Sequence, residues 1–142
     1  MELCCGPISA TEVQEEIPFL CAVVRGGGAD RIGVMYGVGC RVENAGLWTE
    51  LKIQISHLDE WIADSSRRGI YSPGRCDLFI FDGDRLEVLL CHESDIHVTT
   101  SEVQIIRDCA TRWLEKGFRV LSKRLSAGNN WNEVRCIEDA IL

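Results

Sequence analysis

The chain has 142 residues, of which 46% are hydrophobic and 26% are charged, and its formal net charge at pH 7 is −7. This composition is typical of a folded globular protein, and it excludes a disordered, collagenous or coiled-coil chain. Because phosphate binding requires a basic surface, the acidic balance argues against a nucleic-acid partner.

The N-terminal residues carry no targeting signal that we can identify. Met1–Cys5 contain no basic residue, and the apolar stretch Ile17–Val24 is short for a signal peptide and contains Pro18. No segment approaches the roughly 18 apolar residues that a membrane span needs. We therefore expect a cytoplasmic protein without membrane contact, in which the eight cysteines are reduced.

The first half of the chain is expected to form three strands. Residues 1–15 are polar and acidic, and we expect them to form a loosely ordered lead-in. Ile17–Val24 is rich in β-branched and apolar residues, whereas Arg31–Val42 and Leu47–Ile55 alternate apolar and polar side chains. Gly26–Gly28 lacks the lysine and the following helix of a phosphate-binding loop, so we expect no nucleotide cofactor.

A helix is expected to follow these strands. Ser56 and Asp59 have the spacing of a capping box, and Gly69 is a natural helix end. The sequence then predicts a hairpin, because Asp82-Gly83 separates the apolar runs Cys76–Phe81 and Arg85–Cys91.

The last third of the chain predicts a strand, a helix, a strand and a terminal helix. Residues 92–99 are expected to continue as a strand or to bend into one. The apolar stripe of residues 101–116 predicts a helix, and residues 118–125 resemble a strand. Asn130 and Glu133 would cap the terminal helix.

This order of elements, βββα-βββα-β-α, predicts an α+β fold in a single domain over residues 1–142. Hairpin-linked strands favour a mostly antiparallel sheet, with two main helices packed on one face and a short C-terminal helix.

The densest set of reactive side chains is the run from His92 to His97. On an extended strand Glu93, Asp95 and His97 would share one face, where they are candidates for acid–base catalysis together with His92. Asp95 and His97 could both reach one metal ion, but a third ligand would have to come from another strand, for which the sequence offers His57 or a carboxylate. The alternative is a solvated strand face with no ligand.

Two tryptophans are candidate interface residues. Trp48 shares its strand face with polar residues, and Trp131 lies on the apolar side of the expected terminal helix. The favoured interpretation is a non-enzymatic protein-binding module of adaptor or immunity type, which forms a homodimer or binds a partner with a basic surface. The alternative is a small enzyme or metal-dependent protein built around His92, Glu93, Asp95 and His97.

Overall fold

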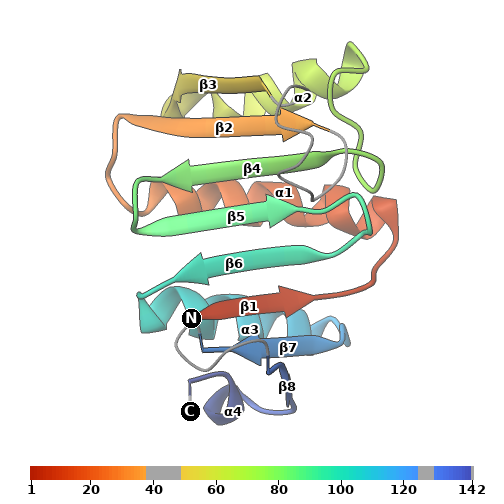
Figure 1. Cartoon of the computed structure of the whole chain (residues 1–142), viewed down its shortest axis with the longest axis vertical. Coiled ribbons are helices and arrows are strands. Elements are labelled where there is room, and N and C mark those ends of the chain that lie inside the picture. Colours follow the sequence, from red (N-terminus) through yellow and green to blue (C-terminus); the bar gives the residue numbers. More distant parts are fainter. Residues whose placement is uncertain (38–48, 125–129, 142) are drawn as a thin grey trace.

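A computed structural model describes residues 1–37, 49–124 and 130–141 and contains one eight-stranded sheet with helices packed against it (Figure 1). In chain order its elements are β1 (Glu2–Cys5), α1 (Ala10–Arg25), β2 (Arg31–Gly37), β3 (Thr49–Gln54), a 3₁₀ turn (Ile55–His57), α2 (Leu58–Arg67), β4 (Asp77–Asp82), β5 (Leu86–Leu90), β6 (Ile96–Thr100), α3 (Val103–Glu115), β7 (Val120–Lys123), β8 (Asn132–Val134) and α4 (Ile137–Ile141). The fold is therefore α+β, as the sequence predicts.

The strand order across the sheet is β3-β2-β4-β5-β6-β1-β7-β8, and every neighbouring pair is antiparallel. The N-terminal strand β1 is an interior strand, because it pairs with β6 on one side and with β7 on the other. The first residues of the chain thus join the hairpin strands β4, β5 and β6 to the C-terminal strands.

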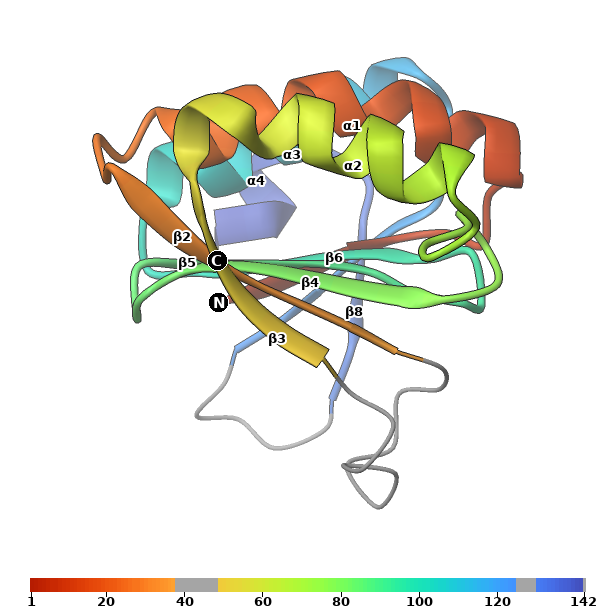
Figure 2. The same cartoon turned by 90° about the horizontal axis from the view of Figure 1, so that it is seen from above.

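The helices α1, α2 and α3 all lie against one face of the sheet (Figure 2). Side chains that point to this face form the core, which includes Leu3 and Cys5 of β1, Val34 of β2 and Val88 of β5. We call this the covered face, and we call the opposite face, on which no described helix lies, the open face (Figures 1 and 2).

Two predictions for the N-terminal region are wrong. Residues 1–15 are not a loose lead-in, since they contain β1 and the start of α1. Ile17–Val24 is not a strand, because Val13, Ile17, Leu20, Cys21 and Val24 recur at helical spacing and are buried along one side of α1. Ser9 and Glu12 form the capping box that begins this helix, with their side chains bonded to each other's backbone N–H groups.

The C-terminal helix also differs from the prediction. It begins at Ile137 rather than near Asn130, because Asn132–Val134 pairs with β7 as the edge strand β8. Trp131 therefore precedes a strand and does not lie on a helix. The predicted capping box at Ser56 is absent too, since that residue lies inside the 3₁₀ turn and α2 begins without a side-chain cap.

Other predicted elements are confirmed with small shifts of their ends. Strands β4 and β5 pair as the hairpin expected from Asp82-Gly83, and α3 occupies the stripe predicted for residues 101–116. The predicted strand 31–42 is present as β2 up to Gly37, and its last residues lie outside the described part of the chain.

A buried carboxylate joins α1 to α3. Glu16 has no exposed surface, and its two oxygens accept hydrogen bonds from Arg112 at 2.7 and 3.0 Å and from the Trp113 indole at 3.1 Å. Lys116 adds an ion pair at 2.6 Å. Burial alone would raise the pKa of Glu16, but these cations outweigh burial and hold that pKa below its ordinary value.

Candidate functional site

The predicted run from His92 to His97 is mostly a turn, and its two histidines belong to different clusters. His92, Glu93 and Ser94 connect β5 to β6, and Ser94 has a left-handed backbone with φ of 65°. Glu93 is exposed and does not face Asp95 and His97 from a common strand. The four candidate residues therefore do not form one site.

Asp95 and His97 do meet, and the third side chain beside them is Cys4. His97 lies on β6 opposite Cys4 on β1, where the antiparallel register makes the two residues direct partners. The Cys4 Sγ atom lies 3.7 Å from His97 Nε2. One potential ligand atom from each of Cys4, Asp95 and His97 falls within 4.8 Å of the others. We call these three residues the His97 cluster.

The other imidazole nitrogen of His97 is held by a carboxylate. His97 Nδ1 lies 2.9 Å from Glu2 Oε1, and Lys123 Nζ lies 2.9 Å from the second oxygen of Glu2. Burial disfavours a charged His97, but its hydrogen bonds with Cys4 and Glu2 outweigh burial and raise the pKa of His97 to about 10. The hydrogen bond with His97 likewise lowers the pKa of Glu2. The surroundings of this imidazole thus favour positive charge.

Trp131 lies beside this network. Its ring makes an edge contact with the His97 ring at a centroid distance of 6.0 Å, and Lys123 Nζ lies 4.8 Å from the Trp131 ring centroid. The Trp131 residue is 36% exposed, so it combines an ordered position with an accessible surface. The other predicted interface residue, Trp48, lies outside the described residues.

His92 belongs to a second cluster, with Asp77 and Cys91. The buried Asp77 carboxylate accepts the His92 backbone N–H at 2.7 Å, and His92 Nδ1 lies 3.0 and 3.2 Å from its two oxygens. Cys91 Sγ lies 3.8 Å from the same nitrogen. Asp77 thereby ties the turn after β5 to the start of β4.

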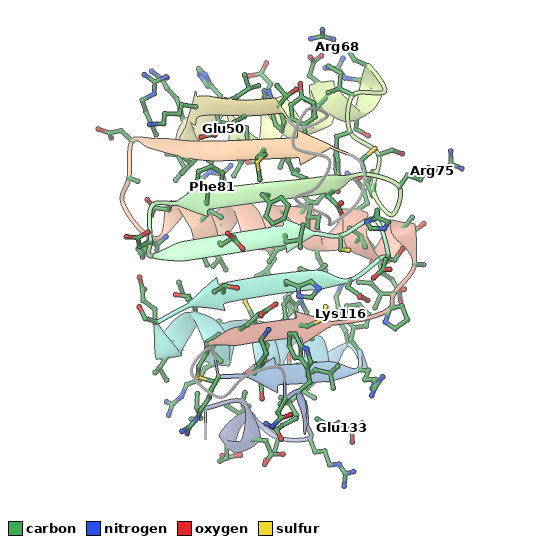
Figure 3. The ribbon with its side chains drawn as sticks, viewed as in Figure 1. Glu50, Arg68, Arg75, Phe81, Lys116 and Glu133 are labelled. Atoms are coloured by element: carbon green, nitrogen blue, oxygen red, sulfur yellow. The ribbon has the colours of Figure 1, made fainter. Side chains whose placement is uncertain are left out.

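The open face of the sheet carries more apolar side chains than a solvated face requires. Alternation along the strands places Met35, Phe79, Phe81, Leu89 and Leu121 on this face, and all five are partly buried. Phe81 lies over Gly33, where a side chain would overlap its ring, and a cavity of about 470 Å³ lies beside these two residues and Lys52. Figure 3 shows the position of Phe81 on β4.

Acidic side chains lie between these apolar residues. Glu87 is the direct partner of Phe81 across β4 and β5 and of Thr99 across β5 and β6. Partial desolvation and the neighbouring Glu2 raise the pKa of Glu87, and desolvation also raises the pKa of Asp95. Among the ion pairs of the described residues, none neutralises Glu87 or Asp95.

Sequence reasoning missed Glu2, Cys4, Asp77 and Lys123. The first two were assigned to a loose lead-in, and their contacts with β6 span 93 or more residues of sequence. The run Glu2–Cys5 is short and ends in two adjacent cysteines, so it shows no alternation that could have identified β1 as a strand.

Comparison of the chain with protein-family models, with curated proteins and with solved structures finds no match. Within residues 1–37, 49–124 and 130–141, no helix has both the length and the apolar character needed to cross a bilayer.

Proposed function

We propose that this chain is a protein-binding module that docks a basic partner on the open face of its sheet. The observation that carries the proposal is the run Leu78–Phe81 in β4, which makes both faces of that strand apolar. An antiparallel sheet with one solvated face normally alternates apolar and polar residues. Phe79 and Phe81 break this alternation on the face that no described helix covers.

The features around Phe81 match those of an interface core. Interfaces concentrate aromatic residues and methionine at their centre and surround them with polar groups. Phe81 has Gly33 and a cavity of about 470 Å³ on one side and Glu87 on the other. The Phe81 ring already fills the space directly over Gly33, so an incoming apolar side chain would enter the hollow beside Phe81 and Gly83.

The acidic charge that favours a basic occupant lies on the Glu87 side of Phe81, whereas the hollow on its other side is lined by Arg31 and Lys52. Glu87 has a raised pKa because it is partly desolvated and lies near Glu2, so a lysine or arginine from a partner would relieve the repulsion. The formal net charge of −7 would also attract a basic partner at longer range.

A random-peptide display library provides a defined probe for this proposal. Peptides are selected on the immobilised wild-type chain. Their binding is then measured on the immobilised variants Phe81→Glu, Glu87→Lys and Val103→Glu. Val103 is 49% exposed on α3, so its variant introduces the same charge on the helix side of the molecule. We expect the selected peptides to be rich in lysine, arginine and apolar residues, and to be lost on the first two variants alone.

Two results would contradict the proposal. One is selection of peptides that bind all four proteins equally, or that carry no excess of basic residues. The other is a dimer mass for the wild type in light scattering that becomes a monomer mass in Phe81→Glu, since a second copy would then occupy the face.

A further inference from the structure

We propose that Cys4, Asp95 and His97 form a Zn²⁺ site, with Glu2 as the residue that positions the histidine. The proposal does not depend on the docking function, because it rests on a separate set of side chains. The set combines a thiol, an imidazole and a carboxylate, and these are the three ligand types that zinc takes in proteins. A set of three leaves the fourth tetrahedral position for water, which is the arrangement of catalytic rather than structural zinc sites.

The spacing of the ligand atoms fits a zinc ion. Zn–S and Zn–N bonds of about 2.3 and 2.0 Å at a tetrahedral angle place sulfur and nitrogen roughly 3.5 Å apart. The observed distance from Cys4 Sγ to His97 Nε2 is 3.7 Å. The Asp95 carboxylate completes the group within 4.8 Å. The ion therefore needs no movement of the strands that carry Cys4 and His97.

The surroundings orient the ligands as a metal site requires. A zinc-bound histidine commonly donates its second ring N–H to a carboxylate, which fixes the ring and its tautomer. Glu2 occupies that place, at 2.9 Å from His97 Nδ1, and is itself held by Lys123. The Asp95 carboxylate occupies the space beside Gly6 that any side chain at that position would take. His97 and Asp95 are only partly buried, so an ion can enter from the open face.

The cluster of Asp77, Cys91 and His92 contains the same three residue types but is a poorer site. Its imidazole presents Nδ1 to both oxygens of Asp77, and the same carboxylate accepts the His92 backbone N–H. A metal ion on that nitrogen would have to displace a hydrogen bond that holds the turn. This cluster therefore serves as the matched control.

The test uses the full chain, freed of metal with a chelator and kept reduced. Zn²⁺ is titrated in competition with a chromophoric chelator, and Co²⁺ is then added as a spectroscopic substitute. We expect one equivalent of either ion, with thiolate-to-cobalt charge-transfer absorption and the visible bands of tetrahedral cobalt. Cys4→Ser should abolish the charge-transfer band, and Asp95→Asn and His97→Gln should each weaken binding. Glu2→Gln should lower the Zn²⁺ affinity by about 10- to 100-fold while its circular dichroism still shows a folded chain.

The control variants are Cys91→Ser, His92→Gln and Cys136→Ser, the last of which removes an exposed thiol. All three should bind like the wild type. The proposal is overturned if the folded wild type binds no ion in competition with the chelator. It is equally overturned if binding survives Cys4→Ser and Asp95→Asn together, or if it is lost in Cys91→Ser or Cys136→Ser.

Discussion

The two faces of the sheet are built from alternate residues of the same strands, yet they have different chemistry. On the covered face Val34, Ile80 and Val88 are almost fully buried beneath the helices. On the open face their neighbour Phe81 is only partly buried, and their neighbour Glu87 is exposed. Burial of apolar area is the main source of folding free energy, so the covered face should determine stability. The open face contributes less to folding, and it is the face on which we propose that a partner docks.

The two histidine clusters repeat this contrast on a smaller scale. Asp77 uses its carboxylate to fasten the turn at His92, so that cluster supports the fold. In the His97 cluster the carboxylate of Glu2 holds Nδ1 of the histidine, and Nε2 faces Cys4. The same three residue types thus serve a structural role in one place and offer a ligand set in the other.

The largest loss of stability should come from the covered face. Trp113 is completely buried, and its indole N–H bonds to Glu16. Trp113→Ala should lower the free energy of unfolding by about 4 kcal/mol, because a large cavity forms and a carboxylate loses a donor. Urea unfolding followed by circular dichroism measures this, and a loss below about 1 kcal/mol would contradict the assignment of the core.

Removal of the Glu16 charge should cost somewhat less. Glu16→Gln leaves Arg112 and Lys116 without their buried partner, and we expect a loss of about 3 kcal/mol at pH 7. The native pKa of Glu16 is lowered, so its contribution to stability is fully present above its ordinary pKa and is lost as the pH falls from that value through the lower native pKa. The difference in stability between wild type and variant should therefore shrink in acid.

The neighbouring Glu15→Gln is the control for this effect. Glu15 has a largely exposed side chain and lies 3.7 Å from Lys116, so its removal should change stability by less than about 0.5 kcal/mol. An equal loss in the two variants would mean that the buried contacts of Glu16 do not stabilise the fold.

Substitution of two adjacent residues of β4 gives the simplest comparison of how much each face of the sheet contributes to stability. Ile80→Ala should cost about 3 kcal/mol because Ile80 is buried under the helices. Phe81→Ala on the open face should cost about 1 kcal/mol, since it loses mainly cross-strand contact. Equal losses in urea unfolding would show that the open face is part of the core.

No loss of stability is expected from a change at Tyr71. Its hydroxyl is buried and has no hydrogen-bond partner among the described residues, and desolvation raises its pKa. Tyr71→Phe removes this unsatisfied group, so stability should stay the same or rise by up to about 1 kcal/mol. A clear loss of stability in thermal unfolding would mean that the hydroxyl has a partner.

Local signals predicted the hairpin of β4 and β5 and the helix α3, because turn residues and apolar periodicity lie within those segments. Helix α1 was missed although Ser9 and Glu12 have capping-box spacing, since the β-branched and apolar residues of Ile17–Val24 favoured a strand. The pairing of β1 with β6 and β7 joins residues about 90 to 120 positions apart, and no local pattern specifies such a partner. Asp95 and His97 could therefore be identified as a possible pair, but Cys4 could not.

The proposed docking face can be tested most directly by methyl NMR of alternate residues within single strands. Leu89 and Leu121 point to the open face, whereas their neighbours Val88 and Val120 point to the covered face. On titration with the basic peptide selected on the wild type, the methyl signals of Leu89 and Leu121 should shift, and those of Val88 and Val120 should stay nearly unchanged. Larger shifts for the two valines, or shifts confined to the helices, would contradict binding at the open face.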